Sequence, residues 1–464
     1  MKMKFIVFKK LTAVILTALM LISFVPFFAS AAGTDYTIVN PYANVNWSTT
    51  GQYKANLHTH STVSDGSEDF SAMVERHYAL GYDILAMTDH GTVDKSWTNL
   101  NIHPLLTFAM NIDTLGSNSK PLTLQRFEEI TAGVGRDGRG MLRVPDGIEQ
   151  NAASFNNTHV NSFFCDYGDG YLGGTSYYDQ VLKGVQDAGG LSFINHIGMY
   201  TGAQNDTAAA AYDTNNLHYN YMIKKFTKLF ENYHTCVGME IINADDNRTQ
   251  NDRKLWDILL ENVIPTGRSI FGFGNSDAHS LSAIDTSWEI MCMPANTVEN
   301  LRTCMEQGAF FAGTRDIKNP LELAQLEKET GLTLGTAWTA PSGTVQPKVT
   351  DIAVNQQTDQ IKITAQDCKT IHWIANGRVI CVGSTLNLDS YSSSIGSYVR
   401  AEIWGPGGIL YTQPFVLHYA GEPVPQSFFF FDFGSILNYF ERAFYSFVAS
   451  SKVLTYVQHL ALGD

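Results

Sequence analysis

The amino-acid sequence predicts an α/β domain followed by a small all-β domain and a helical tail. From residue 53 to about 314, apolar strand-like runs alternate with amphipathic helix-like stretches. This order is typical of parallel strands joined by crossover helices. From residue 348 to 419, short alternating strands separated by turn residues replace that pattern, which is typical of an antiparallel sandwich. We therefore expect a barrel, or an open sheet covered on both faces, in the first region.

Composition and charge restrict the class of protein. The 464 residues are 44% hydrophobic and 12% aromatic, which excludes a disordered or fibrous chain and allows two or three domains. The formal charge of −14 argues against a protein that holds nucleic acid along a basic surface. We expect a folded, multidomain protein without stable nucleic-acid binding.

The first residues, 1–31, have the pattern of a signal peptide. A basic start is followed by an apolar run over 11–28 and by the small residues Ala29-Ser30-Ala31, as a cleavable export signal requires. An uncleaved membrane anchor is the alternative, because the run approaches the roughly 20 residues that span a bilayer. Cleavage would remove Lys2, Lys4, Lys9 and Lys10. It would leave a more acidic protein that is secreted or associated with the cell surface.

The elements of the α/β region follow in order along the chain. Strands are expected over 54–59, 82–88, 191–195, 237–242 and 270–274, with helices over 68–80, 177–188, 219–233 and 253–262. The first helix places Phe70, Met73, Val74 and His77 on one face. Because the carboxyl ends of parallel strands meet at one rim, functional side chains are expected there.

The C-terminal third is expected in three parts. Residues 315–345 are weakly patterned and rich in Gly, which predicts a linker, and residues 346–420 form the sandwich. The tail, 427–464, contains four consecutive Phe and a helical stretch with an apolar stripe. We expect this helix to pack on its own protein or on a partner; contact with a membrane interface is the alternative. Of the six cysteines, Cys368 and Cys381 are the best candidate disulfide pair.

Histidines and carboxylates gather at the predicted strand ends. His58 and His60 lie two residues apart in a strand, so their imidazoles face the same side, and Asp65 follows in the next loop. Further clusters end in His90, Glu149, His196, and the pair Asp277 and His279. Imidazole and carboxylate together are what a site for two or three divalent metals needs.

The ordered motifs resemble those of the polymerase-and-histidinol-phosphatase (PHP) superfamily of metal-dependent phosphoesterases. The motifs are HTHSTVSDG, LAMTDHG, PDGIEQN, THV, INHIG, GMEIIN and GNSDAHS. The resemblance covers roughly residues 53–314 and extends loosely into the sandwich, which is similar to the tail module of secreted relatives. It implies a distorted (β/α)7 barrel over 50–314 that holds two or three divalent transition metals, Mn, Fe or Zn.

The resemblance also implies the role of individual residues. The implied metal ligands are His58, His60, Asp65, His90, Glu149, His159, His196, Asp277 and His279, with Glu149 as the bridging carboxylate. Asp89 and Glu240 would orient ligands or bound water. His159 is the least anchored of the ligands, because no strong motif precedes it.

The implied reaction is hydrolysis of a small phosphomonoester or phosphodiester by a metal-activated hydroxide. Positive charge for the phosphate is expected from Arg143, Arg248 or Arg253, and His103 or His218 would reach substrate from long loops. Two alternatives stay open. One is an amidohydrolase-like metal hydrolase, a class that usually adds a metal-bridging lysine, and the other is a non-catalytic cell-surface binding protein that works through its sandwich.

Overall fold

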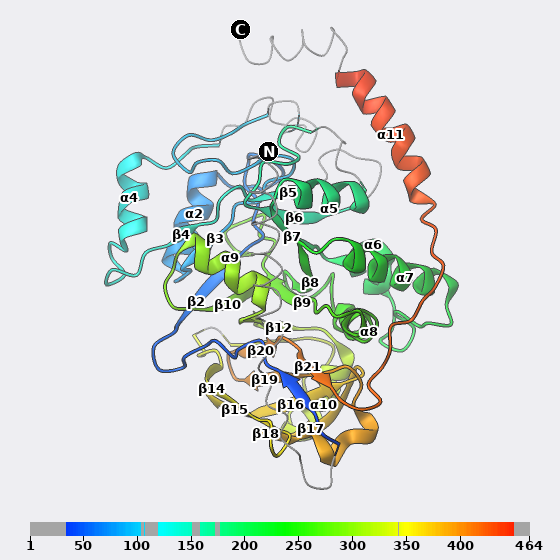
Figure 1. Ribbon diagram of the computed structural model, residues 1–464. Coiled ribbons are helices and arrows are strands. Elements are labelled where there is room, and N and C mark those ends of the chain that lie inside the picture. Colours follow the sequence, from blue (N-terminus) through cyan, green and yellow to red (C-terminus); the bar gives the residue numbers. More distant parts are fainter. Residues whose placement is uncertain are drawn as a thin grey trace, which may run out of the picture.

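The computed structural model describes residues 34–103, 106, 119–150, 158–171, 177–341 and 343–449. The predicted signal peptide and the last part of the tail lie outside these residues. Figure 1 shows an α/β part above a β-rich part, with one helix projecting from the side of the molecule. The chain is thus a mixed α/β protein with several sheets, as the sequence predicts.

Three short parallel strands begin the α/β part. They are β2 (Gly51–Asn56), β3 (Ile84–Leu85) and β4 (Leu142–Arg143). Helix α2 (Phe70–Ala79) follows β2 and buries the face predicted for it, including Phe70 and Met73. Helix α4 (Leu124–Ala132) precedes β4. Strand β3 has two residues where the sequence predicts seven, because the chain beyond Leu85 makes only scattered bonds, such as Thr88 N–H to the carbonyl of Thr59.

A second sheet has five strands in the order β5-β6-β7-β8-β9. Its strands are β5 (Ile148–Gln150), β6 (Val160–Phe163), β7 (Leu191–Ile194), β8 (Cys236–Asn243) and β9 (Phe271–Asn275). Helices α5 (Tyr178–Asp187), α7 (Leu217–Asn232) and α8 (Asp252–Val263) lie between them in sequence, and the short α6 (Ile197–Thr201) follows β7. Bridges between Thr59 and Ala278 and between His90 and Glu149 join this sheet to the first.

Not every strand of the second sheet is parallel, in contrast to the expectation from the alternating pattern. Strands β7, β8 and β9 are parallel, but β6 is antiparallel to both β5 and β7. Only residues 151–159 separate β5 from β6, and a parallel crossover needs about a dozen residues. This connection is therefore too short for the expected arrangement.

The first sheet continues into the C-terminal part of the chain. Strand β10 (Ser287–Met293) pairs with β2 and with β11 (Phe310–Thr314), and α9 (Val298–Gln307) lies between β10 and β11 in sequence. Strand β11 then pairs with β20 (Gly408–Thr412), and β1 (Thr37–Val39) pairs with β21 (Phe415–His418). One eleven-stranded sheet thus runs through both parts.

The C-terminal strands pack around a common apolar core. A three-stranded sheet contains β14 (Lys348–Asn355), β15 (Gln360–Gln366) and β18 (Thr385–Asn387), whereas β16 (Thr370–Ala375), β17 (Arg378–Val382) and β19 (Tyr398–Gly405) belong to the large sheet. The 3-10 helix η3 (Leu388–Ser394) follows β18. Ile361 of the small sheet and Trp373 of the large one are buried in the same cluster.

The predicted linker is not a linker but contains regular structure. Helix α10 (Pro320–Thr330) lies within 315–345, flanked by the paired strands β12 (Asp316–Ile317) and β13 (Trp338–Thr339). The Asn319 side chain caps the helix by accepting bonds from the N–H groups of Leu321 and Glu322 at 2.9 and 3.1 Å. Its buried apolar residues are only Leu323 and Leu326, which explains the weak hydrophobic pattern.

The tail forms a helix, α11 (Gly434–Ala449). The segment before it is fixed to α7, because Asp432 accepts a hydrogen bond from Tyr221 at 2.7 Å and lies 3.4 Å from Lys225. Helix α11 then projects from the body (Figure 1), and Ile436 and Leu437 on it are 50 and 64% exposed. None of the helices in the described part of the chain has the length and apolar character that a bilayer span needs.

All six cysteines are free thiols, so the expected Cys368–Cys381 disulfide is absent. The strand register explains this difference, because Cys381 lies opposite Trp373, whereas Cys368 precedes β16. The Sγ of Cys368 instead lies 3.4 Å from the carbonyl oxygen of Thr370.

Candidate metal centre

The site begins where β2 ends. Beyond Asn56 the chain stays extended through the bridge at Thr59, so His58 and His60 point to the same side, as their spacing predicts. Both imidazoles are fully buried, and their Nε2 atoms lie 3.1 Å apart. Two buried ring nitrogens are thus directed at one point.

Two carboxylates meet the histidine pair. The Oε2 atom of Glu149 lies 3.1 Å from Nε2 of both His58 and His60. The Oδ1 atom of Asp277 lies 3.2 and 3.1 Å from the same two nitrogens. These four buried residues come from the ends of three different strands, and each offers one ligand atom within 4.8 Å of the others.

The remaining predicted ligands surround this group. His90 Nε2 lies 3.4 Å from Glu149 and 3.6 Å from Asp65, and His279 Nε2 lies 3.4 Å from Asp65. His196 Nε2 is 3.4 Å from Glu149 Oε1, and His159 Nδ1 is 2.8 Å from the same oxygen. The nine residues implied by the motifs are therefore brought together, with Glu149 at their centre.

His159 differs from the other histidines in its hydrogen bonding. Its Nδ1 bonds to Glu149, and its Nε2 lies 2.9 Å from the Tyr200 hydroxyl. Both ring nitrogens therefore have partners within the protein. Its position beside Glu149 agrees with the motif, while its role as a ligand stays a prediction.

Asp89 and Glu240 form hydrogen bonds that orient the predicted ligands or the loop next to them, as their motifs imply. Glu240 Oε1 accepts a 2.8 Å hydrogen bond from His58 Nδ1, and its Oε2 accepts one from the His196 backbone N–H at 3.0 Å. Asp89 accepts bonds from the hydroxyls of Ser61 and Ser64 at 2.8 and 2.7 Å. The first residue orients an imidazole, and the second fixes the loop that leads to Asp65.

Two ligand positions have uncommon backbone conformations. His196 and Asp277 have φ angles of 24° and 44°, in the left-handed region that residues other than Gly rarely adopt. His196 lies two residues after the end of β7, and Asp277 lies two residues after the end of β9. Such strained positions persist where the surrounding structure holds them and are concentrated at functional sites.

The charges of the centre shift the pKa values of its members. Burial alone would raise the pKa of Glu149, but the facing His58, His159 and His90 outweigh it and hold that pKa well below its usual range. Burial alone would lower the pKa of His60, but Asp277 and Glu149 raise it to about 10. The carboxylates therefore create a strongly negative potential at the point where the imidazoles meet.

The donor and acceptor pattern fits a bound cation. Because His58 Nδ1 is hydrogen-bonded to Glu240, its Nε2 is the ring nitrogen that faces the oxygens of Glu149 and Asp277. Asp277 Oδ1 is buried and has no hydrogen-bond donor among the residues that the structure describes. Buried acceptors that face one another are costly unless a positive charge lies between them. Imidazole with carboxylate suits Mn, Fe or Zn, so these buried clusters can hold more than one such ion.

Of the residues expected to reach the phosphate, the structure brings only Arg248 to the centre. Arg248 forms an ion pair with Asp277 and is partly exposed. Arg143 instead donates to the backbone carbonyl of Asp94, and Arg253 is buried between two carboxylates. The other two candidates are also engaged elsewhere, His103 with Asp169 and His218 with the carbonyl of Thr201.

Two neighbours of the centre were not predicted from the sequence. The Asn195 side chain donates to Glu149 Oε1 at 2.7 Å, and the Tyr200 hydroxyl contacts His159. Tyr200 lies four residues after His196, across α6. Residues four apart share a helix face, so this spacing is the one local signal that could have identified it.

Solved structures that the chain matches include proteins described as phosphoesterases. A two-domain protein from Bacteroides vulgatus that contains a predicted PHP-like metal-dependent phosphoesterase is 12% identical over 85% of this chain and 93% of its own, with a TM-score of 0.39. A protein from Bifidobacterium adolescentis proposed to be a metal-dependent phosphoesterase is 13% identical over 49% of this chain and 87% of its own, with a TM-score of 0.28. The lesion-specific endonuclease EndoQ of Pyrococcus furiosus is 14% identical over 55% of this chain and 56% of its own, with a TM-score of 0.30.

PHP-like phosphoesterases are among its structural neighbours. The family that the motifs resemble is therefore represented among the solved structures that match. No family model and no curated protein sequence matches the chain. At these identities the functional assignment depends on the residues of the metal centre.

Proposed function

We propose that this protein is a metal-dependent phosphoesterase of the PHP type that hydrolyses a small phosphomonoester or phosphodiester. The observation that carries the proposal is the buried group His58, His60, Glu149 and Asp277, whose acceptor atoms converge within 4.8 Å. In this proposal the two sheets joined through His90 and Glu149 form the distorted (β/α)7 barrel, and residues 346–420 form the accessory sandwich.

Each part of the centre has a separate task in this proposal. Divalent ions held there would lower the pKa of a water molecule and offset the charge on phosphoryl oxygens. Glu149 contacts histidines on both sides of the centre, which suits the bridging role. Glu240 keeps the proton of His58 on Nδ1 and so keeps Nε2 free for a ligand bond. The guanidinium of Arg248, beside Asp277 at the partly exposed side, is suited to bind a substrate phosphate.

The composition of the centre favours this function over an amidohydrolase-like hydrolase. Among the described residues, the ion-pair partners of Glu149 and Asp277 are histidines and Arg248, and no lysine is one of them. The bridging group is therefore expected to be the carboxylate rather than a lysine. Six of the nine implied ligands are buried: His58, His60, His90, Glu149, His196 and Asp277. This also argues against a non-catalytic binding protein, because burying them without metal is costly.

Metal analysis coupled to a substrate panel tests the proposal. The purified chain is expected to retain at least two equivalents of transition metal and to hydrolyse p-nitrophenyl phosphate or its bis ester. Glu149→Ala should lose metal and activity together, whereas Glu128→Ala, at an exposed position of α4, should lose neither. A folded wild-type protein without metal would overturn the proposal. Cleavage of N-acyl amino acids but not of phosphoesters would favour the amidohydrolase alternative.

We also propose that the protein acts outside the cytoplasm. The basic start, apolar run and Ala29-Ser30-Ala31 of the first residues support this location, and the exposed apolar residues of α11 are suited to contact a cell surface or a membrane interface. An exported protein whose N-terminal sequence begins directly after Ala31 would support cleavage. An intact leader on the exported protein would support the anchor instead.

A further inference from the structure

A cavity separate from the metal centre lies where the α/β part meets the C-terminal strands. It has a volume of about 850 Å³, within the range of small-molecule sites. Its walls come from α8, from α10, and from the turn between β16 and β17 together with β19. We call it the interdomain cavity. None of the nine implied metal ligands lines it.

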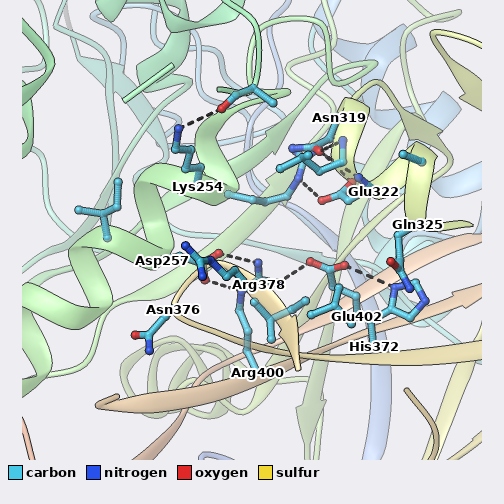
Figure 2. A pocket seen from close by; sticks show the side chains of 18 of the residues that line it. Lys254, Asp257, Asn319, Glu322, Gln325, His372, Asn376, Arg378, Arg400 and Glu402 are labelled. Carbon is cyan, nitrogen blue, oxygen red and sulfur yellow. Dashed lines mark hydrogen bonds and ion pairs between the residues drawn. The ribbon is translucent and has the colours of Figure 1, made fainter. Parts of the chain in front are cut away.

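The carboxylates of the interdomain cavity are satisfied by the protein itself. Arg400 donates to both oxygens of Asp257 at 2.7 and 2.9 Å and to Glu402 at 2.7 Å. Figure 2 shows Arg400 between these two acids. Glu322 is paired with Arg253 in the same way. Glu261, the fourth acid of the lining, accepts bonds from the backbone N–H of Ser397 at 3.1 and 3.2 Å. The four acids are thus held by hydrogen bonds within the protein.

Cations of the same cavity are left without an acidic partner. Lys328 on α10 and Arg378, the first residue of β17, line the cavity and are exposed. Across the described residues neither side chain forms a hydrogen bond or an ion pair. Lys254 on α8 donates to the carbonyl of Ala208 at 2.9 Å and to its neighbours, and to no carboxylate. Three cations from three walls thus line the cavity without a bonded carboxylate, although the chain carries a formal charge of −14.

The rest of the lining is largely apolar. Ile258, Leu321, Ala324, Ile374 and Val379 contribute aliphatic surface from the same walls. Leu321 is 60% exposed, although it lies beside the buried network. Water in this cavity therefore covers apolar side chains, and a ligand that replaces it would gain from burying apolar surface.

We propose that the interdomain cavity binds a small amphiphilic anion, a molecule with an apolar body and one anionic head group. The body would contact the aliphatic lining, and the head group would lie between Lys328 and Arg378. A carboxylate and a phosphate-type head meet the same two cations, and Arg378 can bind either of them with two parallel hydrogen bonds. The proposal does not depend on the function of the metal centre.

Calorimetric titration of the full chain with three ten-carbon probes tests the proposal. Decanoate and decylphosphonate carry an anionic head, whereas decanol does not, and the phosphonate cannot be hydrolysed as an ester. We expect one equivalent of at least one anionic probe to bind at least tenfold more tightly than decanol. The better of the two anions identifies the head group. Equal affinity for decanol, or no binding of any probe below its micelle concentration, would overturn the proposal.

Variants locate the binding and exclude the metal centre and the tail as its source. Lys328→Gln combined with Arg378→Gln should lower the affinity for the anionic probe at least tenfold. Lys362→Gln, at an exposed position of β15 outside the cavity, should leave this affinity unchanged. Ala324→Trp places a large side chain on an exposed lining position of α10, so the protein should still fold but should lose binding. Undiminished binding in a folded Ala324→Trp protein would show that the anion binds elsewhere.

Discussion

Glu240 is positioned to orient residues of the metal centre through its hydrogen bonds. It accepts hydrogen bonds from His58, from the backbone of His196 and from the side chains of Asn243 and Asn275. Glu240→Gln keeps the size but removes the charge, and partners of this kind change metal affinity by about 10–100-fold when they are lost. We expect a loss of that size in a competition titration against a chelator. The exposed Glu299→Gln on α9 is the matched control, and unchanged affinity in Glu240→Gln would refute the positioning role.

His77 gives a prediction for the pH dependence of stability. Burial lowers its pKa to about 4, so between pH 6.5 and 4 the unfolded chain takes up a proton that the folded chain does not. Stability contributed by neutral His77 is therefore present above pH 6.5 and lost as the pH falls, by up to about 3 kcal/mol.

Urea unfolding at pH 7.5 and pH 5 measures this loss. His77→Gln should lose about 2 kcal/mol less than the wild type over this interval, since about 1.4 kcal/mol corresponds to one pH unit. His234→Gln, at an exposed position, should follow the wild type. Parallel loss in His77→Gln and the wild type would mean that His77 does not titrate as its burial requires.

The residues of the centre were predictable to the extent that local spacing decided their direction. His58 and His60 share a side because strand side chains alternate, and this held even though β2 ends before them. Asn195 could not be found in this way, since its contact with Glu149 depends on the antiparallel pairing of β5, β6 and β7. The local sequence likewise did not show which of the three candidate arginines lies at the centre. Only tertiary packing places Arg248 there and buries Arg253 elsewhere.

Among the elements, α10 depends on its cap. Asn319 accepts two backbone N–H bonds at the first turn and also donates to the carbonyl of Gln250 at 2.6 Å. Asn319→Ala should lower the free energy of unfolding by about 1 kcal/mol or more. Asn319→Asp keeps the capping oxygen and should recover part of that loss. Equal destabilisation by both substitutions in chemical denaturation would assign the effect to the Gln250 bond instead.

Helices with strong periodicity were predicted well, and short strands were not. The expected helix over 177–188 is α5 (Tyr178–Asp187), because Val181, Leu182 and Val185 form a buried face. The two-residue strands β3 and β4 leave no period to detect. Helix α10 was missed for a similar reason, because its two buried leucines are too few to show a helical period.

The whole molecule is joined by pairing between strands that are remote in sequence. Strand β11 pairs with β20 over four residue pairs, so the α/β part and the C-terminal strands should unfold in one transition. Coincident curves from calorimetry and tryptophan fluorescence would confirm this. At Gly313 an added Cβ would lie 2.5 Å from the Trp288 side chain and 2.9 Å from that of Leu410, so Gly313→Val should lower the melting temperature or split the transition. Two separate transitions in the wild type would contradict the prediction.

This organisation was beyond the reach of sequence patterns. The change of pattern near residue 348 coincides with the start of a run of strands, but it does not reveal that some of these strands extend the first sheet. Such pairings depend on backbone hydrogen bonds between remote segments, as between β11 and β20 or between β1 and β21. The local sequence of one strand does not indicate which strand it will pair with.

The pairing of β11 with β20 also decides which shorter forms of the protein are soluble. A chain cut after Thr314 would keep every implied metal ligand, yet it would leave the outer edge of β11 with unpaired N–H and C=O groups. It would also expose Phe311, which is fully buried in the intact chain. An open, apolar edge recruits strands from other copies. By covering this edge, the C-terminal strands prevent it from pairing with other copies of the protein. A minimal metal-binding fragment should therefore aggregate unless this edge is redesigned.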